Sequence, residues 1–293
     1  MRLRNPRTRR AYGRAIRQFF DWLGHQAVTN LQDVQPLHVS AFLDDLGAER
    51  SIPTVKAHLA AIRHLFDWLT AGHVTALNPA HAVHGPTYVV ERGKTPILTA
   101  QETRHLLDSI ETDTLVGLRD RALIATMVFG FVRIGAATTL TVENVFTQNR
   151  RLNLRLLEKR TTRHDIACHH TLEAYLVAYL DRARLWGHPQ LPVFQTFLRT
   201  GCQPHGEDRK LSGRPLPQVS AFVIVRRRAK AAGIATAIGN HTFRATGITA
   251  HLKAGGTLEK ARVMAAHRST KTTQLYDRRA EEATLDEFEK IQI

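Results

Sequence analysis

The chain has 293 residues, which exceeds the ~100 to 200 residues of an ordinary single domain, so the length predicts two domains. Hydrophobic residues make up 43% and charged residues 23%, a balance that excludes wholesale disorder and a fibrous protein. No window approaches the ~18 uncharged apolar residues of a membrane-spanning helix. The arginine-rich first segment also lacks the apolar core of a secretory signal.

Charge and cysteine content narrow the class of partner. Lysine and arginine number 41 against 26 aspartates and glutamates, a net charge of +15, which makes a polyanion the expected partner. Nucleic acid is favoured over an anionic membrane, because no short amphipathic basic helix and no lipidation signal is evident. A basic protein without such a partner is the plainer alternative. Cys168 and Cys202 are too few for a disulfide framework, so we expect inert thiols in a reducing cytoplasm.

Residues 1–77 carry the periodicity of amphipathic helices. A first helix places apolar side chains three and four residues apart from Tyr12 onward, and Gly24 is expected at the C′ position that ends it. Pro36 suits the first turn of a second helix, and a third opens near Ser51. The pattern predicts a small helical bundle with basic outer faces. Six of its cations are expected to contact a DNA backbone: Arg7, Arg9, Arg10, Arg14, Lys56 and Arg63.

Residues 78–98 break the helical pattern, since prolines and glycines recur through the segment, and this predicts a linker. Thr99 and Glu102 then form the capping-box pattern of a helix start. A second domain is therefore expected over residues 99–283, followed by a short amphipathic tail over residues 284–293.

The second domain is predicted to be mainly helical with one small β element. The helix expected over residues 115–131 is apolar around its circumference and therefore central to the core. Two extended runs, residues 152–157 and a second ending near Cys168, predict a hairpin with a charged turn at residues 159–164. The Pro- and Gly-rich stretch 187–217 is predicted to be loop. Further helices are expected over residues 172–185, 218–232, 241–254, 257–266 and 270–279.

Two pairs of residues near the C-terminus are candidates for chemistry. His241 and Arg244 are three residues apart and therefore share a helix face, where an arginine fork and an imidazole can meet one phosphate. Taken alone, this pair is better explained by a solvated helix face. His267 and Tyr276 are nine residues apart, and Ser269 is a good N-cap, which predicts a helix break that turns Tyr276 back toward His267.

Six residues of the second domain stand in short motifs: Arg133 in Gly-Phe-Val-Arg, Lys159 in Glu-Lys, His241 and Arg244 in His-Thr-Phe-Arg, His267 in Ala-Ala-His, and Tyr276 in Thr-Gln-Leu-Tyr. In order and spacing these motifs resemble the signature of the tyrosine recombinase, or phage integrase, family. The N-terminal bundle is similar to the family's core-binding domain. The resemblance therefore covers nearly the whole chain.

The resemblance implies a mainly α fold with a small antiparallel β hairpin or sheet, in which a helical core-binding bundle precedes a mixed α+β catalytic domain. It implies a site-specific DNA recombinase or integrase that cleaves and rejoins DNA strands through a 3′-phosphotyrosyl intermediate. The implied catalytic residues are Tyr276 as nucleophile, His241 as base, Lys159 as general acid for the 5′-hydroxyl, Arg133 and Arg244 as stabilisers of the phosphate charge, and His267 as a further hydrogen-bond donor.

Three positions depart from the family's pattern. Ala136 stands where an acidic residue usually follows the first arginine, which removes a support for Arg133. Ala266 replaces the glycine that usually precedes the third-motif histidine. The turn after Lys159 reads Arg-Thr-Thr-Arg rather than a glycine-rich run, so a neighbouring base is an alternative to Lys159 as the residue that reaches the cleaved phosphate.

The implied chemistry needs no metal and no cofactor, because the arginines, the lysine and the histidines supply the positive field that Mg²⁺ would otherwise give. The implied partners are double-stranded DNA recombination sites and three further copies of the chain, in a homotetramer on synapsed DNA, with no membrane. The tail, residues 284–293, is expected to dock on a neighbouring protomer, and packing on its own domain is the alternative. We expect a cytoplasmic, nucleoid-associated protein encoded by a bacterium or a mobile element.

Two other functions fit the same residues. A type IB topoisomerase uses a similar set of side chains to relax supercoiled DNA as a monomer. A DNA-binding protein with a degenerate site would occupy recombination sites without cutting them. The sequence leaves open the DNA target, the need for accessory DNA-bending proteins, and the choice among integration, excision, resolution and transposition.

Overall fold

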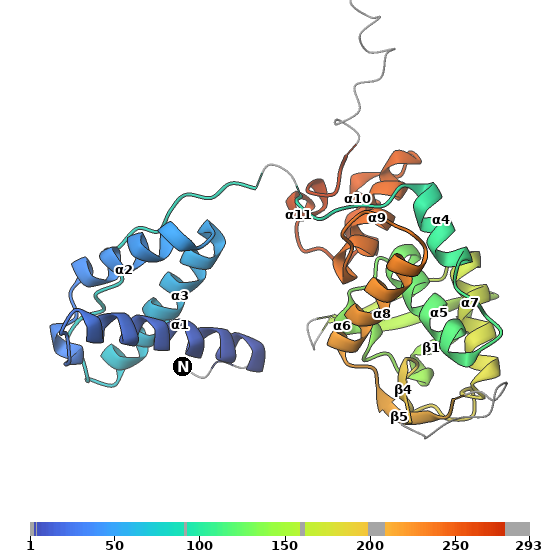
Figure 1. Cartoon of the computed structure of the whole chain (residues 1–293), viewed down its shortest axis with the longest axis horizontal. Coiled ribbons are helices and arrows are strands. Elements are labelled where there is room, and N and C mark those ends of the chain that lie inside the picture. Colours follow the sequence, from blue (N-terminus) through green and yellow to red (C-terminus); the bar gives the residue numbers. More distant parts are fainter. Residues whose placement is uncertain (1–2, 4, 91–92, 159–161, 199–208, 279–293) are drawn as a thin grey trace, which may run out of the picture. The chain divides into compact units, whose positions relative to one another are not determined.

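The computed structural model describes residues 3, 5–90, 93–158, 162–198 and 209–278. The chain forms two compact units, residues 1–90 and residues 91–293, each with its own hydrophobic core (Figure 1). Both units are mainly helical and the strands are few and antiparallel, which confirms the predicted fold class. Among the described residues, no helix combines the length and the apolar character that crossing a bilayer requires.

The first unit is a bundle of three helices, α1 (Pro6–His25), α2 (Pro36–Glu49) and α3 (Ile52–Ala71), with a short 3-10 turn, η1 (Leu31–Asp33). Each α-helix has a proline in its first turn, where the missing N–H removes no helical hydrogen bond. The apolar stripes meet in the bundle centre, where the buried rings of Phe19 and Phe42 pack edge to face with centroids 5.1 Å apart.

The first helix does not end at Gly24, as the sequence predicts, but continues to His25. Ala27, with a φ of 58°, takes the left-handed position that closes the helix, and the amides of Ala27 and Val28 bond back to the carbonyls of Gly24 and Leu23. The closing position therefore lies three residues beyond the predicted one, because a position usually filled by glycine is filled here by alanine.

The segment after α3 packs on the bundle before it leaves the first unit. Ala80 and Val83 are buried in the bundle core, and Arg63 donates hydrogen bonds to their carbonyl oxygens at 3.1 and 2.5 Å. Among the described residues of the expected linker, 78–98, none lies in a helix or strand. Its last residue, Leu98, is buried in the core of the second unit.

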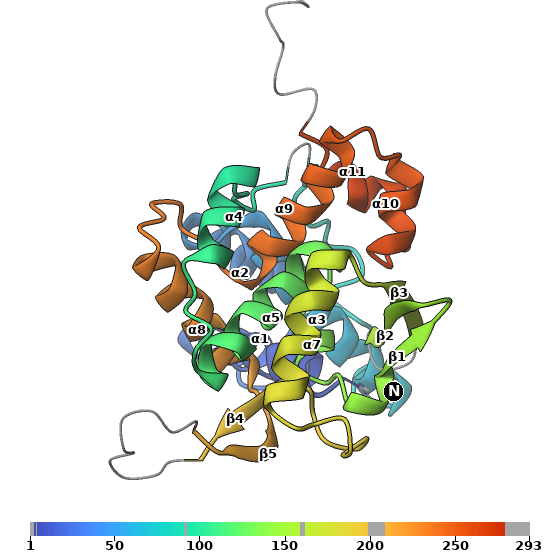
Figure 2. The same cartoon turned by 90° about the vertical axis from the view of Figure 1, so that its right-hand side faces the viewer.

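The second unit is built around α5 (Leu115–Phe129), most of whose side chains are buried, as its apolar circumference predicts. It is packed by α4 (Ala100–Asp108), α7 (His170–Arg182) and α9 (Asn240–Lys253), and α7 runs beside it in Figure 2. The predicted capping box opens α4: Thr99 Oγ1 accepts from the amide of Glu102 at 3.1 Å, and the Glu102 carboxylate accepts from the amide of Thr99 at 2.8 Å.

A three-stranded antiparallel sheet covers one side of this core. Its strands are β1 (Val145–Gln148), β2 (Arg151–Glu158) and β3 (Thr162–Ala167), in the order β1-β2-β3. The predicted hairpin is confirmed as β2 and β3, and residues 159–161 of its turn lie outside the described residues. Alternate side chains of β2 face the core, as its period of two requires: Leu152, Leu154 and Leu156.

The stretch 187–217 is not entirely loop, as predicted, because β4 (Gln195–Phe197) and β5 (Leu211–Pro215) pair within it. Strands of three and five residues, next to glycine and proline, are too short to show an alternating pattern. The remaining elements are η2 (Val142–Asn144), α6 (Ile134–Ala137), α8 (Gln218–Ala231), α10 (Leu258–Met264) and α11 (Thr270–Gln274). The last of these is shorter than the predicted 270–279, and the tail, residues 284–293, lies outside the described residues.

A buried carboxylate fixes α8 to α5. Asp120 is fully buried in α5, and its oxygens accept from Arg119 at 2.7 Å, from Arg227 at 3.1 Å and from Arg228 at 2.9 Å. A buried charge requires such partners, since an unpaired carboxylate in this position would be strongly destabilising. The position of α8 along α5 is therefore set by charge-assisted hydrogen bonds as well as by apolar contact.

Candidate active site

Arg244 is the centre of the candidate site. It lies in the first half of α9 with 1% of its surface exposed, and its guanidinium donates to the carbonyl oxygens of Phe131 and Ala265. These carbonyls precede Arg133 and His267 by two residues each. One arginine therefore ties together the turn after α5, the end of α10 and the helix that carries His241.

Arg133 lies close enough to His241 for its positive charge to act on the imidazole ring. Arg133 is half-buried at the start of α6, and His241 is exposed in the first turn of α9. Partial burial of the ring, and then the positive charges of Arg244 and Arg133, hold the pKa of His241 below its usual value of ~6.5. The imidazole is therefore mostly neutral at pH 7 and able to accept a proton.

His267 and Tyr276 are brought together by the helix break that the sequence predicts. Ser269 caps α11 by accepting a hydrogen bond from the amide of Lys271 at 3.2 Å. The rings of His267 and Tyr276 then stack nearly parallel, with centroids 5.7 Å apart and planes at 13°. Nδ1 of the buried His267 lies 3.0 Å from Oγ1 of Thr273, which holds the ring in place.

A small apolar core packs against the side chain of Tyr276. Tyr276 is half-buried against a cluster of buried residues from the turn after α5, from α9 and from the α10 region: Phe131, Ile248, Leu252, Ala261 and Ala265. Its carbonyl oxygen accepts from Oγ1 of Thr249, on α9, at 2.8 Å. Phe131 and Ala265 are also the residues whose carbonyls hold Arg244, so the tyrosine and the buried arginine share one support.

Two of the departures from the family's pattern occupy distinct environments. Ala136 is buried in the core beside α8, so an acidic side chain is replaced here by an apolar contact. Ala266 has a φ of 47°, the left-handed region that favours glycine. It closes α10 in a Schellman motif, in which the amides of Ala266 and His267 bond to the carbonyls of Val263 and Arg262.

Other predicted residues lie apart from this cluster or outside the described residues. Lys159 falls in the undescribed turn between β2 and β3. In the first unit, Arg63 is half-buried and uses its guanidinium on the carbonyls of Ala80 and Val83. The other expected DNA contacts of that unit are exposed: Arg7, Arg9, Arg10, Arg14 and Lys56.

Sequence reasoning missed four residues that support the site. Thr273 orients His267, and its place in the Thr-x-x-Tyr motif was an available signal. Arg262 donates to the His267 carbonyl at 3.1 Å and pairs with Glu259 on α10. Gly247 lets α9 approach α5, since an added Cβ would lie 2.0 Å from the Val128 carbonyl oxygen. Phe131 adopts a φ of 51°, a strained conformation for an aromatic residue that no sequence pattern signals.

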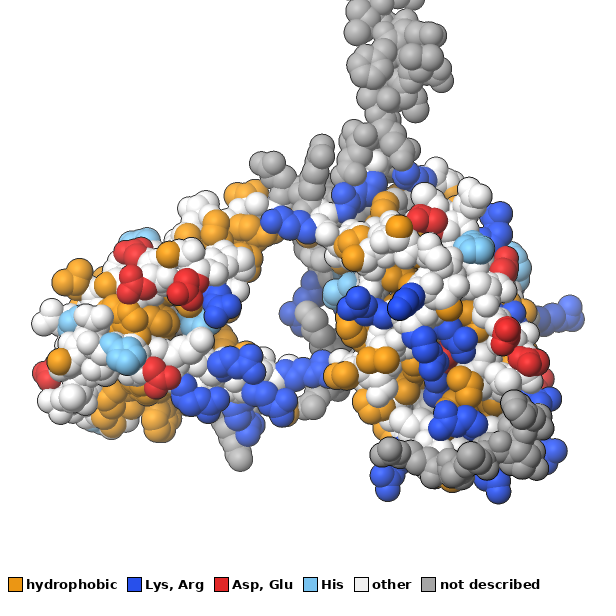
Figure 3. All heavy atoms as spheres, in the orientation of Figure 1, with side chains coloured by type: hydrophobic (Ala, Val, Ile, Leu, Met, Phe, Trp, Pro, Cys, Tyr) orange, Lys and Arg blue, Asp and Glu red, His pale blue; other side chains and the backbone are white. Residues whose placement is uncertain are grey.

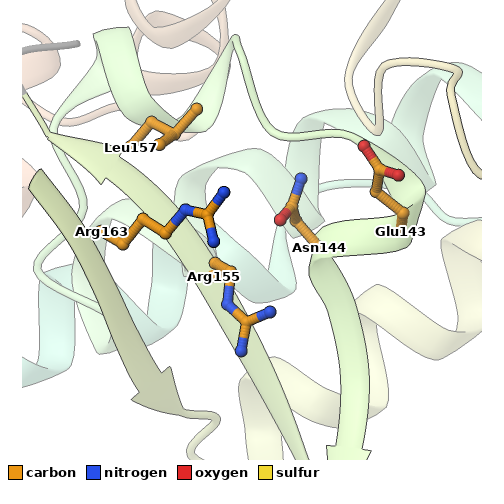
Figure 4. A pocket seen from close by; sticks show the side chains of 5 residues that line it. All are labelled: Glu143, Asn144, Arg155, Leu157 and Arg163. Carbon is orange, nitrogen blue, oxygen red and sulfur yellow. The ribbon is translucent and has the colours of Figure 1, made fainter. Parts of the chain in front are cut away.

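Two hollows of the second unit lie elsewhere. One, of about 360 Å³, opens over the sheet beside β1 and β2 and is lined by Glu143, Asn144, Arg155, Leu157 and Arg163 (Figure 4). The other, of about 470 Å³, opens between α4, α5, α7 and α9, where His169, Tyr175 and Arg104 contribute to its wall. None of the five described candidate catalytic residues lines either hollow.

Lysine and arginine side chains spread over the visible face of the second unit in Figure 3. Within the described residues, no group of three or more histidine, cysteine, aspartate or glutamate side chains could hold a metal ion. Burial, and then the charge of Glu173, raise the pKa of the Cys168 thiol to about 12, which fits the inert thiol expected there. Cys202 lies outside the described residues.

Comparison with known proteins places these features in one family. Residues 96–283 match the model of the phage integrase family, and residues 2–73 match the phage integrase N-terminal SAM-like domain. A curated relative, tyrosine recombinase XerD of Corynebacterium glutamicum, is 26% identical over 272 residues, which cover 90% of this chain and 85% of the relative.

Solved structures share the fold. XerH site-specific recombinase bound to its difH substrate aligns with a TM-score of 0.67 at 19% identity, over 96% of this chain and 77% of that one. A lambda integrase tetramer bound to a Holliday junction aligns with a TM-score of 0.63 at 16% identity, over 91% of this chain and 73% of that one. The family models together span both units, and the chain therefore belongs to the phage integrase family of tyrosine recombinases.

Proposed function

We propose that Tyr276 is the nucleophile of this recombinase and that Arg133, His241, Arg244, His267 and Lys159 serve the same phosphate. Site-specific recombination of DNA is the activity that the family match and the curated relative support. One observation carries the assignment of residues: Arg244 bridges the carbonyls of Phe131 and Ala265, while His267, two residues beyond, stacks on Tyr276. Three stretches of the chain, the turn after α5, α9 and the end of α10, therefore pack against the Tyr276 side chain, which supports the assignment.

The chemistry follows from the residue types. The Tyr276 oxygen attacks phosphorus, the phenolic proton passes to neutral His241, and the bond from phosphorus to the 5′-oxygen breaks. The leaving 5′-oxygen takes a proton from Lys159, in the undescribed hairpin turn, and the tyrosine remains joined to the 3′-phosphate. Charge that builds on the non-bridging oxygens is stabilised by Arg133 and Arg244, at about 3 kcal/mol each by analogy with other single donors. The 5′-hydroxyl of a partner strand reverses these steps and completes the exchange.

The partners follow from relatives and from charge. The XerH and lambda integrase structures hold DNA, and one of them is a tetramer on a Holliday junction. We expect this chain to act on duplex recombination sites as a synaptic tetramer, with its tail, residues 284–293, exchanged between protomers. Comparing intact protein with protein lacking these residues, by the number of protomers on synapsed DNA, tests the exchange. An unchanged tetramer would contradict it.

Covalent trapping tests the assignment of the nucleophile. On a nicked duplex that loses its 5′-hydroxyl fragment after cleavage, the wild-type chain should accumulate a protein–DNA adduct. Tyr276→Phe removes one oxygen and should abolish the adduct while leaving DNA binding intact. Tyr175→Phe is the matched control, because Tyr175 lies half-buried beneath Arg121, away from the cluster, and should leave adduct formation unchanged. Adducts formed by Tyr276→Phe would overturn the assignment.

The same trapping separates the two other functions. A topoisomerase would relax one plasmid without joining two sites, and a degenerate binder would form no adduct at any pH. Recombinant joints between two supplied sites are the result that the proposal requires.

A further inference from the structure

The helix α8 carries apolar side chains on both of its faces. Its inner face is buried in the core of the second unit through Ala221, Ile224, Val225 and Ala229. Its outer side exposes Val219 by 76%, Val223 by 58% and Phe222 by 40%. Residues three and four apart lie together on a helix, so these side chains form one patch rather than scattered exposure.

Phe222 has a structural explanation and the two valines do not. The Phe222 ring packs against the turn before α9, where an added Cβ at Gly239 would lie 3.3 Å from it. The Arg226 guanidinium covers the same ring, 5.8 Å from its centroid. Val219 and Val223 are more exposed than Phe222, and neither belongs to a hydrophobic core of the described residues.

The patch adjoins the candidate active site. Gln218, the first residue of α8, has its Nε2 2.9 Å from where a Cβ on Gly135 would lie, and Gly135 is two residues beyond Arg133. The carbonyl of Gln218 also accepts a hydrogen bond from Asn240, the neighbour of His241, at 3.5 Å. In Figure 1 the N-terminal part of α8 lies next to α6. Because a helical turn rises about 5.4 Å, Val219 and Val223 lie within two turns of this junction.

Charge indicates what covers the patch. On the same face, the helix continues to Arg226 and Lys230, both exposed. Arg227 lies beside them, tied to the buried Asp120. An outer face of two valines followed by cations suits a surface that offers methyl groups beside phosphates. The major groove of DNA does so: it is about 12 Å wide, admits one helix, and presents the thymine C5-methyl, which no other base carries.

We propose that Val219 and Val223 select thymine in the major groove next to the cleaved phosphate, through contact with its C5-methyl group. This inference rests on the proposed function, because the position of α8 on the DNA follows only if the cleaved phosphate lies at Arg244. Arg226 and Lys230 then neutralise the flanking phosphates without reading the sequence. Asp120 acts as a positioning residue, because it fixes the half of the helix that follows the valines.

Selection from a pool of random duplex DNA tests the inference and requires no defined target sequence. The wild-type chain should enrich thymine at one or two neighbouring positions beside the cleavage point. Val219→Ala and Val223→Ala should lose the thymine preference at these positions and keep the wild-type base preferences at all other positions. Val263→Ala is the matched control, because Val263 is 52% exposed on α10 and should leave all preferences unchanged.

Deleting the methyl from the DNA completes the test. Replacing the selected thymine with uracil should weaken wild-type binding about fourfold, the effect of one buried methyl group. The same replacement should not weaken binding by the alanine variant of the valine that contacts this base, either Val219→Ala or Val223→Ala. Equal losses in wild type and both variants, or none in wild type, would overturn the inference. So would alanine variants that alter only self-association, since the patch would then contact a second copy of the chain.

The outcomes separate this inference from the proposed function. If the wild-type chain enriches no sequence and forms no covalent adduct, the proposed function fails. If it enriches a sequence and forms adducts but the valine variants keep the thymine preference, only the inference fails. Val219→Thr, which keeps the shape of valine, should retain part of the preference. Thermal unfolding of each variant shows whether the fold is intact.

Discussion

At the scale of single residues, His241 is the group whose charge state the fold controls most directly. Burial and two arginines lower its pKa, so the neutral form persists below pH 6.5. Because a base must be neutral, cleavage should be sustained above the lowered pKa and lost as pH falls through it. In single-turnover cleavage, His241→Gln should reduce the rate by about 10² to 10⁴ and remove this acid limb.

An exposed histidine of the same unit provides the control for that profile. His188→Gln should keep both the rate and the acid limb, since His188 lies on the surface outside the cluster. An unchanged acid limb in His241→Gln would show that another group takes the proton.

Ala266 is strained by its position rather than by its neighbours. A φ of 47° places its Cβ against its own backbone, at a helix end where glycine is free of that cost. Ala266→Gly should therefore raise the free energy of unfolding by about 1 kcal/mol, which corresponds to a rise of roughly 2–4 °C in Tm. Thermal unfolding measures the change.

The same substitution in a regular helix should have the opposite sign. Ala250 lies exposed within α9, and Ala250→Gly should lower the free energy of unfolding by about 1 kcal/mol. If both variants were destabilised, the strain assigned to Ala266 would be absent.

Residue identity and spacing predict much of the candidate cluster. Tyr276, His267 and Arg244 lie in short motifs, and the N-cap at Ser269 indicates how His267 and Tyr276 can meet. The hydrogen-bond partners of Arg244 could not be predicted in this way. They are the backbone carbonyls of Phe131 and Ala265, and because every residue carries a carbonyl, no residue type signals them.

At the scale of elements, the approach of α9 to α5 positions Arg244. An added Cβ on Gly247 would lie 2.0 Å from the Val128 carbonyl oxygen and 2.8 Å from the ring of Phe131. Gly247→Ala should push the helices apart, lower the free energy of unfolding by about 1–3 kcal/mol, and slow covalent cleavage because the Phe131 carbonyl moves from Arg244. Calorimetry and adduct formation report the two effects.

A glycine in an uncrowded helix is the matched comparison. Gly13 lies within α1, and a Cβ there would meet nothing within 4 Å. Gly13→Ala should stabilise its helix by up to about 1 kcal/mol, since alanine is the better helix former. A Gly247→Ala variant as stable and active as wild type would contradict the close packing.

Elements with a long periodic pattern are the ones that the sequence predicts well. The helix α5 and the β2–β3 hairpin are examples, since burial on one or all sides dictates their composition. The pair β4 and β5 was missed because its strands, of three and five residues, are too short to show an alternating pattern. Helix ends were missed where alanine takes a left-handed conformation, as at Ala27.

At the scale of the whole molecule, the stacking of Tyr276 on His267 of the same chain supports cleavage within one protomer. Tyr276→Phe lacks the proposed nucleophile, and Arg133→Gln lacks one of the proposed cations for the phosphate but keeps the tyrosine. A mixture of the two variants on a nicked substrate should form no more adduct than the two variants alone. Restored adduct formation would show that the tyrosine acts on a phosphate held by another protomer.

The identity of the DNA-linked residue tests the central claim most directly. The wild-type adduct on a nicked substrate would be digested with protease and nuclease, and the nucleotide-bearing peptide sequenced by mass spectrometry. The account predicts one modified residue, Tyr276, joined through its phenolic oxygen to a 3′-phosphate, with a free 5′-hydroxyl on the released strand. A link through another residue, or to a 5′-phosphate, would contradict it.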